Sequence, residues 1–569
     1  MNPRDHWAVN NIAVIGAGIV GIPMAALLAE SRVRLGSDDP ASVTLIQRNS
    51  ATSGWKVEAV NSGKCPLRGV EPHLPEIISK AVADGLLRAS HDFAAARDAD
   101  VILICVQTDK DGFKPDYAPL NEALGDLLEA LDTRSNPRPP LIIFESTLAP
   151  TSMATLIQDK FSRSGRTDGR EVMLGNSPNR VMPGFLVERI RTSDKLIGGL
   201  RSETSRRIGE LYSQLVSDGT LHLTNCGTAE VVKTLENAYR DVRIAYSAEV
   251  ARFCDQRDID FYEVRERVNE RLRRSDASTR APQSVPTGGI LIPTIGVGGH
   301  CLPKDGILLL WRMIEAGQDM KSSLILEARR INDLSPAEAV RLMEARFGPL
   351  EGRAVALLGT AYRFNSEDTR NSPSLALAQL LIKKRCEVRL HDPYVKQNDQ
   401  NLTKFGLEGI FSNDLDEALG SAEYVVFCTA HGSYSEEKEK IIGAAPHLRG
   451  VFDGCHLLGK AESGSDTIQY AGIGNGRKRP PSDLVDLVHL GFLCMERGFA
   501  NEINELVDFL NGRYGTDRFN TIDYKEVQRL AATCATGCDI ADPGPVPDYP
   551  LERGFFSGLV EKAIRPRGR

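Results

Sequence analysis

The sequence predicts an α/β protein with two Rossmann-like, doubly wound domains, a central domain built on a long helix, and a C-terminal extension. Three observations carry this prediction. An apolar segment at 11–15 leads into a glycine turn and a helical pattern, residues 227–258 keep a helical pattern over many turns, and a second strand, turn and helix alternation begins at 355. The predicted domain boundaries are 1–215, 216–335, 336–480 and 481–569.

Length and composition fit a large enzyme. A chain of 569 residues predicts roughly three or four domains, each with its own core. The net charge of −7 and the lack of a long basic run argue against nucleic acid as a partner, and no stretch approaches about 18 uninterrupted apolar residues, so no membrane span is expected. The first ten residues lack the apolar core of a signal peptide, and eleven scattered cysteines fit a reducing compartment. We therefore expect a cytoplasmic protein, without a metal site, since no second Cys/His pair accompanies Cys534 and Cys538.

The N-terminal glycine turn predicts a dinucleotide site. Gly16 permits a tight turn after the strand at 11–15, Gly18 lets a pyrophosphate approach the backbone, and Gly21 lets the following helix pack on the strand. Further strand-like runs at 43–47, 101–106 and 141–144 favour a parallel sheet. The alternative is a glycine turn without a ligand.

A second glycine-rich turn, at 296–305, contains a candidate nucleophile. Cys301 is followed by Lys304 and then by a predicted helix over 307–316, and both the cation and the positive end of a helix favour thiolate over thiol. The alternative is a turn in which Asp305 caps the helix and the cysteine has no chemical role.

The long helical segment at 227–258 has a buried stripe and a polar interruption. The predicted stripe consists of Val231, Leu235, Ala238, Val242 and Ala245. Lys233 and Asn237 are four residues apart and therefore share one face, from which they could stabilise an oxyanion. A solvated helix face is the competing interpretation.

The third region repeats the strand, turn and helix pattern. Strands are expected at 355–359, 387–391 and 424–429. After a basic, proline-containing linker at 477–481, helical periodicity is expected at 483–488 and 500–512, and a loop at 541–550. A packing arm, a partner-binding segment and a small helical cap are all open for this extension.

Several separated motifs occur in a fixed order along the chain. They lie at 16–21, 144–147, 176–184, 229–240, 296–305, 359–363 with 368–373, and 391–394. With these motifs the sequence resembles the UDP-glucose/GDP-mannose dehydrogenase family from about residue 11 to about residue 476. The resemblance implies an NAD-binding first domain, a central dimerisation domain with the catalytic cysteine, a third domain that binds a nucleotide sugar, and a homodimer or higher homo-oligomer that shares the long helix.

The resemblance also implies roles for individual residues. Catalytic roles fall to Cys301, Lys233, Asn237, Asp305 and Thr147. Cofactor contacts fall to Gly16, Gly18, Ile19, Val20, Gly21, Gln47, Arg48, Thr108 and Thr147. Substrate contacts fall to Arg180, Lys233, Asn237, Arg240, Gly298, Lys304 and Arg370, although Arg370 could equally be a surface residue paired with Asp368.

Together these roles imply a four-electron oxidation of a sugar C6 alcohol to a uronic acid through a thioester on Cys301, with two NAD molecules consumed. The His300-Cys301 pair and the segment at 236–249 resemble the UDP-N-acetylhexosamine (UDP-ManNAc or UDP-GlcNAc) branch. UDP-glucose or GDP-mannose 6-dehydrogenase, a degenerate binding or regulatory member, and a two-electron dehydrogenase are the alternatives.

Four departures from the family pattern qualify this interpretation. Gln47 and Arg48 stand where an acidic residue ordinarily holds the adenosine ribose, which leaves NADP open as a cofactor, although Arg48 could also be a solvated surface residue. Asn179 replaces a glutamate, and an amide cannot be a general base. Either Glu145 or Asp305 then activates water, or thioester hydrolysis is slow, or the product differs. Arg363 replaces a lysine, and Ala248 an asparagine.

Overall fold

The computed structural model describes residues 7–67, 71–181, 184–273, 289–459, 468–515, 517–534, 537–550 and 557–564. The chain divides into two compact units. Unit 1 holds residues 1–236, 307–318 and 505–539, and unit 2 holds residues 237–306, 319–504 and 540–569. Within the described residues, no helix is both long and apolar enough to cross a membrane.

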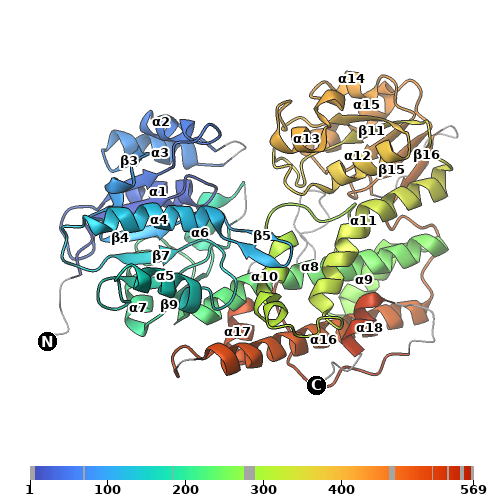
Figure 1. Cartoon of the computed structure of the whole chain (residues 1–569). Coiled ribbons are helices and arrows are strands. Elements are labelled where there is room, and N and C mark those ends of the chain that lie inside the picture. The colour runs from blue at the N-terminus through green and yellow to red at the C-terminus, as the bar shows by residue number, and fades with distance from the viewer. Residues whose placement is uncertain are drawn as a thin grey trace. The chain divides into compact units, whose positions relative to one another are not determined.

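Unit 1 contains an eight-stranded sheet, whose elements can be followed in Figure 1. The strand order is β10-β9-β8-β7-β4-β1-β2-β3, and every pair is parallel except β8 with β9. The strands are β1 (Asn11–Ile15), β2 (Ser42–Ile46), β3 (Leu87–Ser90), β4 (Val101–Ile104), β7 (Leu141–Phe144), β8 (Met173–Asn176), β9 (Lys195–Gly199) and β10 (Leu221–Asn225). A short antiparallel hairpin, β5 (Asp109–Asp111) with β6 (Lys114–Asp116), follows β4.

Both faces of this sheet are buried, as a doubly wound fold requires. Ile12 and Val14 face one core, which includes residues of α1 (Gly21–Glu30), α3 (Leu74–Ala83), α6 (Leu186–Thr192) and α7 (Ser202–Tyr212). Ala13 and Ile15 face the other core, which includes residues of α4 (Ala118–Asp132) and α5 (Gln158–Arg163). A short helix, α2 (Trp55–Asn61), follows β2.

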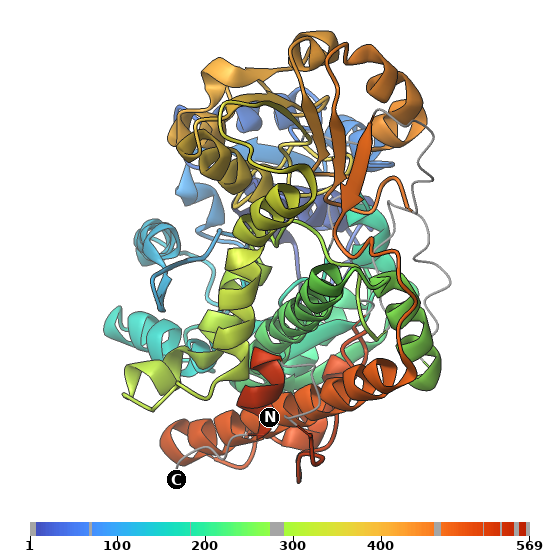
Figure 2. The same ribbon diagram turned by 90° about the vertical axis from the view of Figure 1, so that its right-hand side faces the viewer.

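Unit 2 contains a second sheet, with six parallel strands in the order β13-β12-β11-β14-β15-β16. The strands are β11 (Ala354–Leu358), β12 (Glu387–His391), β13 (Phe411–Ser412), β14 (Tyr424–Phe427), β15 (Gly450–Asp453) and β16 (Gln469–Gly472). Its helices are α12 (Pro373–Lys383), α13 (Gln400–Phe405), α14 (Leu415–Leu419) and α15 (Gly432–Ala444). Figure 2 shows the chain running from α11 (Leu324–Phe347) into this sheet.

The remaining helices include three that contribute residues to both units: α8 (Cys226–Arg257), α10 (Leu302–Glu315) and α16 (Ser482–Tyr514). The others are α9 (Phe261–Arg271), α17 (Tyr524–Ala531) and α18 (Gly558–Ile564). Only Gln256 and Arg257 of α8 are exposed. A stripe of α8 that includes Lys233, Asn237 and Arg240 is half-buried, and most of its other residues are buried.

The predicted fold class is confirmed, with local differences. The helix after Cys301 begins at Leu302, so Asp305 lies in its first turn and the expected start near 307 was wrong. The two helices expected at 483–488 and 500–512 form the single helix α16. Residues 541–550 form no helix or strand, as predicted. Met182 and Pro183 of the motif at 176–184 lie outside the described residues.

Candidate functional site

The glycine turn of unit 1 has the geometry of a phosphate-binding turn. Gly16 has φ +105°, and a Cβ there would lie 2.7 Å from the Cys105 carbonyl oxygen. A Cβ at Gly21 would lie 1.9 Å from the Gly16 carbonyl oxygen, so only glycine allows this approach of α1. A Cβ at Gly18 would meet no atom within 4 Å, which leaves open space beside the backbone next to the N-terminus of α1.

Two side chains hold this turn from the second strand and the helix that follows it. Gln47, directly after β2, accepts a hydrogen bond at Oε1 from the Ala17 N–H at 2.8 Å and donates through Nε2 to Ser53 Oγ at 2.9 Å. Lys56 Nζ donates to the Ala17 carbonyl at 2.8 Å, and burial lowers the pKa of this ammonium. Lys56 was not predicted from the sequence, because no motif marks it.

The other predicted cofactor residues lie at or beside the C-terminal ends of neighbouring strands. Thr108 Oγ1 donates to the Thr147 carbonyl at 2.7 Å, which joins the loops after β4 and β7. Ile19 is a partly exposed apolar residue of the glycine turn, beside Val20. Arg48 is paired with Glu122 and Asp126 of α4, as expected for a solvated surface residue.

Asn179 belongs to a buried polar cluster with Glu145, Lys195 and Tyr212. The Glu145 carboxylate accepts from Asn179 Nδ2, from the Tyr212 hydroxyl, and from Lys195 Nζ at 2.9 Å. Lys195 Nζ also donates to Asn179 Oδ1 at 3.0 Å, so the amide bridges the ion pair. Burial raises the pKa of Glu145 and lowers that of Lys195. The Glu145 side chain has no solvent exposure, and its oxygens are engaged by these three partners.

In unit 2, Cys301 is exposed and occupies the N-cap position of α10. Its carbonyl accepts the backbone N–H of Asp305 at 2.9 Å and that of Lys304 at 3.2 Å. A thiol at a helix N-terminus is favoured as thiolate by the unsatisfied N–H groups of the first turn. All eleven cysteines lie among the described residues, and none forms a disulfide.

Beside Cys301, Asp305 links Asn237, a predicted catalytic residue, to Lys304, a predicted substrate contact. Its Oδ2 accepts from Asn237 Nδ2 at 2.6 Å, and its Oδ1 pairs with Lys304. Both Lys304 and Asp305 are buried. Lys233, in unit 1, shares with Asn237 and Arg240 the half-buried stripe of α8.

The cysteine turn is clamped by the segment at 362–371. The Gly299 N–H donates to the Arg370 carbonyl at 2.8 Å, and Asn371 Nδ2 donates to the Gly299 carbonyl at 2.9 Å. A Cβ at Gly298 would lie 2.5 Å from Tyr362 Cβ, so glycine is required for this packing. The Arg370 guanidinium forms a pair with Asp368, with Nη2 2.6 Å from Oδ2.

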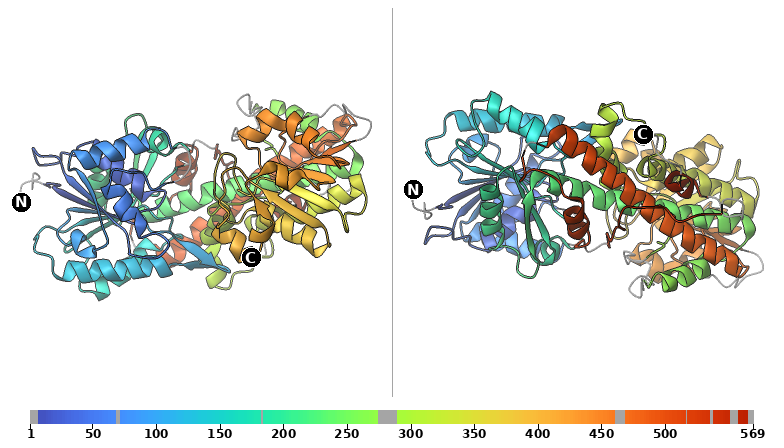
Figure 3. Two further views of the ribbon diagram at one scale, coloured as in Figure 1. Left: turned by 90° about the horizontal axis from the view of Figure 1, so that it is seen from above. Right: turned by 90° about the horizontal axis from the view of Figure 1, so that it is seen from below.

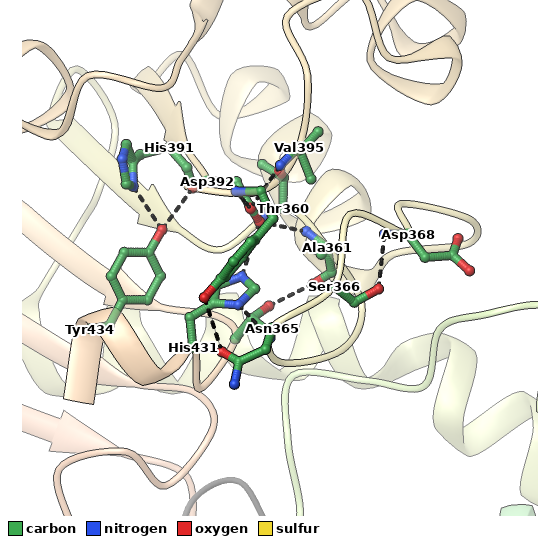
Figure 4. A network of polar contacts seen from close by, with 12 residues as sticks. Thr360, Ala361, Asn365, Ser366, Asp368, His391, Asp392, Val395, His431 and Tyr434 are labelled. Carbon is green, nitrogen blue, oxygen red and sulfur yellow. Dashed lines mark hydrogen bonds and ion pairs between the residues drawn. The ribbon is translucent and has the colours of Figure 1, made fainter. Parts of the chain in front are cut away.

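A second network of hydrogen bonds closes the turn that follows β11 in the six-stranded sheet (Figure 4). Asp392, directly after β12, accepts at Oδ2 from the backbone N–H groups of Thr360 and Ala361 at 2.8 and 2.9 Å. His431 Nε2 lies 3.1 Å from the same oxygen, and its Nδ1 accepts from the Asn365 N–H at 2.8 Å, which assigns the Nε2–H tautomer. Burial alone would raise the pKa of Asp392, but His431 and the backbone donors hold it below its usual value. His431 was not predicted from the sequence.

The chain has two α/β domains with mainly parallel sheets. One has an open glycine turn, and the other is hydrogen-bonded to the turn that carries a thiol at a helix N-terminus. This combination is typical of a nucleotide-dependent oxidoreductase. Family models agree in order along the chain. The NAD binding domain of the UDP-glucose/GDP-mannose dehydrogenase family matches residues 10–216, its central domain residues 227–334, and its UDP binding domain residues 356–460.

Individual relatives cover most of the chain. The chain is 31% identical over 470 residues to a UDP-N-acetyl-D-mannosamine dehydrogenase of Pyrococcus horikoshii, spanning 82% of this chain and 99% of that protein. It is 27% identical to an NDP-N-acetyl-D-galactosaminuronic acid dehydrogenase of Ralstonia nicotianae, over 74% of this chain and 91% of the relative. A solved NDP-N-acetyl-D-galactosaminuronic acid dehydrogenase from Methanosarcina mazei aligns with a TM-score of 0.66 at 30% identity, covering 82% and 96% of the two chains.

The chain therefore belongs to the UDP-glucose/GDP-mannose dehydrogenase family. It is an oxidoreductase of the nucleotide-sugar dehydrogenase type, and its NAD binding domain assigns NAD as the cofactor.

Proposed function

We propose that the protein is a nucleotide-sugar 6-dehydrogenase that oxidises the C6 primary alcohol of a UDP-N-acetylhexosamine to the uronic acid. The observation that carries the proposal is the position of Cys301 at the N-terminus of α10, in front of Asp305, which holds Asn237 and Lys304. The substrate class rests on the relatives, which are named for N-acetylated sugar nucleotides.

The residues of the first turn fit the cofactor. The open space at Gly18 and the N-terminus of α1 suit a pyrophosphate. The loops that carry Thr108 and Thr147 follow neighbouring strands of the same sheet. Gly16, Ile19, Val20, Gly21 and Gln47 complete the set that we assign to cofactor binding. When bound, NAD accepts hydride, and two molecules are used for each acid formed. Because Arg48 is paired with Glu122 and Asp126, we favour NAD over NADP.

Cys301 supplies the covalent step. Its thiolate adds to the C6 aldehyde and forms a C–S bond, and the aldehyde oxygen takes a proton to give a thiohemiacetal. Loss of hydride and of the hydroxyl proton converts the thiohemiacetal to a thioester. Water then adds to the carbonyl carbon, the C–S bond breaks, and the acid and the Cys301 thiol are released. Each oxidation removes two electrons from carbon, so the two oxidation steps together are a four-electron oxidation.

Asn237 and Lys233 are the proposed oxyanion donors in these steps. Asn237 is preoriented, because its amide donates to Asp305 Oδ2 at 2.6 Å. Both carboxylates considered for water activation, Glu145 and Asp305, are buried, and we assign this role to Asp305 because it lies in the first turn of α10, directly after Cys301. The other proposed substrate contacts are Arg240, Gly298, Lys304 and Arg370.

The amount of NADH formed for each sugar tests the proposal. Wild type, Cys301→Ser and the control Cys65→Ser are incubated with NAD and UDP-ManNAc, UDP-GlcNAc, UDP-glucose or GDP-mannose. We expect two NADH for each N-acetylated UDP-sugar in wild type and in the control, and at most one, without uronic acid, in Cys301→Ser. Two NADH for each sugar in Cys301→Ser would rule out the thioester on Cys301, and activity with UDP-glucose or GDP-mannose alone would rule out an N-acetylated substrate. A wild type that binds nucleotide sugar but forms no NADH would support a binding protein.

A further inference from the structure

The residues after about 480 are an addition to the catalytic chain. The Pyrococcus horikoshii relative is covered over 99% of its length by 82% of this chain, and the last family model ends at residue 460. The described part of the addition consists mainly of α16, α17 and α18. The proposed function assigns it no role.

In unit 2, α16 packs along α8 through aromatic residues with polar anchors. Figure 3 shows the two helices side by side. The Tyr246 hydroxyl donates to the Val488 carbonyl at 2.7 Å, and the Tyr239 hydroxyl donates to Glu496. Ring centroids of Tyr239 and Phe499 lie 5.2 Å apart. The contact is specific, because each buried phenol has a polar partner as well as an apolar one.

Helix caps fix the same packing from both sides. Glu502 of α16 accepts from the Leu324 N–H at 3.0 Å and from Ser323 Oγ at 2.6 Å, at the N-terminus of α11. In return, Glu249 of α8 accepts from the Gly558 N–H at 2.8 Å, at the N-terminus of α18. A carboxylate satisfies helix N–H groups and complements the helix dipole, so the extension and the rest of unit 2 cap one another.

In unit 1, Arg180 is the contact point of the extension. Its Nη2 donates to the Leu530 carbonyl at 3.0 Å, and its Nη1 donates to Thr533 Oγ1 at 2.8 Å, at the C-terminus of α17. The Thr533 hydroxyl donates to the Leu530 carbonyl at 2.7 Å, so its oxygen is the acceptor for Arg180. Arg180 also pairs with Glu236 of α8, and the two side chains are only 6% and 4% exposed.

This arrangement leaves little of Arg180 for a ligand. A guanidinium at the C-terminus of a helix satisfies its last carbonyl and complements its dipole. Both terminal nitrogens of Arg180 are engaged in this way, and the buried charge is neutralised by Glu236. Glu236 precedes Asn237 directly on α8, so the contact is made beside residues that we assign to catalysis.

We propose that the extension stays docked on α8 of its own chain as a fixed part of the packing around that helix. We also propose that Arg180 is the residue that docks it, rather than a ligand of the nucleotide sugar. The reassignment of Arg180 rests on the proposed function, whereas the docking itself does not. Asn225 supports the same docking, since its Nδ2 donates to the Phe519 and Thr521 carbonyls at 2.9 and 3.1 Å.

A double-mutant cycle in the full chain tests the proposal. The variants are Arg180→Lys, Thr533→Val and the double variant, with Thr533→Ser as the conservative control. The readouts are hydrogen exchange of 524–531, the melting temperature, and KM for the nucleotide sugar. We expect each single variant to raise exchange in this segment about tenfold, the double variant to add little, Thr533→Ser to match wild type, and KM to stay within about twofold.

Two results would overturn the proposal. If Arg180→Lys raised KM for the nucleotide sugar more than tenfold while Thr533→Val changed neither KM nor exchange, Arg180 would be a substrate ligand. If exchange rose additively, Arg180 and Thr533 would not form one contact. If wild type formed no NADH, the proposed function would fail while the exchange cycle still measured the docking.

Discussion

The two sheets begin alike and use their first turns differently. Gly16 and Gly359 follow the first strand of each sheet, and each donates its N–H to the last residue of the second strand at 2.8 Å. In unit 1, the neutral Gln47 takes one N–H of the turn, and Gly18 remains open. In unit 2, the carboxylate of Asp392 takes two N–H groups of the turn. The same pair of strands therefore forms a phosphate-binding turn only where the backbone N–H groups of the turn are not taken by a side chain and can bind a ligand.

The largest expected effect comes from the glycine turn of unit 1. In Gly21→Ala the new Cβ would lie 1.9 Å from the Gly16 carbonyl oxygen, so α1 must move. We expect NAD affinity to fall at least about 100-fold, or roughly 2.7 kcal/mol. Gly18→Ala is the matched variant, because its Cβ would contact no protein atom within 4 Å. It should weaken the binding of NAD while leaving the melting temperature unchanged. Calorimetric titration measures the NAD affinity, and thermal melting measures the stability. A stable Gly18→Ala with wild-type NAD affinity would contradict the claim that the pyrophosphate binds in the open space at Gly18.

The buried cluster behind the unit 1 turn predicts the next effect. Asn179→Glu places a second carboxylate beside Glu145 in a site with one lysine, and we expect a loss of about 3 kcal/mol in the free energy of unfolding. Asn179→Ala removes the amide without adding charge and should cost less. Urea denaturation of both variants tests this. A more stable and more active Asn179→Glu would show that the amide only replaces a catalytic glutamate.

Closure of the unit 2 turn should depend on pH. Asp392→Asn removes the charge that holds two backbone N–H groups and His431, and we expect a loss of about 2 kcal/mol. The folded pKa of Asp392 is lowered, so its contribution is complete above the unfolded value near 4 and is lost as pH falls through the folded value. Urea denaturation from pH 3 to 7 should show a constant gap between wild type and variant that narrows below about pH 4. Asp416→Asn, at an exposed position, is the control, and a pH-independent gap would refute the ionic role.

The smallest effect concerns the edge of the cofactor site. Glu122→Gln with Asp126→Asn releases Arg48 from both partners, and a free arginine after β2 can receive a 2′-phosphate. We expect kcat/KM for NADP relative to NAD to rise about fivefold, or roughly 1 kcal/mol, since the pairs are exposed. Glu129→Gln on the same helix is the control. An unchanged ratio would mean that Arg48 does not face the adenosine ribose.

The sequence predicted the sheets well because buried strands have a local apolar pattern. The segments at 11–15, 141–144 and 387–391 are strands with the expected bounds, and the glycine turn lies where its spacing indicated. It also placed Cys301 ahead of a helix. The start of that helix was misplaced because an aspartate such as Asp305 suits the first turn of a helix as well as its cap.

Long-range polar contacts could not be predicted, since no local pattern encodes them. Asn179 was seen as a missing base, whereas the fold makes it a bridge between Glu145 and Lys195. Arg180 was matched to the substrate, but a helix that lies about 350 residues further along the chain accepts its hydrogen bonds. These partners lie far apart in sequence and meet only through tertiary packing.

The most direct test of the central claim is the ratio of NADH formed to nucleotide sugar consumed. Absorbance at 340 nm with limiting UDP-ManNAc or UDP-GlcNAc and excess NAD gives this ratio at completion. We predict two NADH for each sugar in wild type, with the uronic acid as the product. In Cys301→Ser the aldehyde cannot form a thiohemiacetal, so we predict at most one NADH for each sugar and no uronic acid. A ratio of one, with an aldehyde as the final product, would contradict the four-electron mechanism through Cys301.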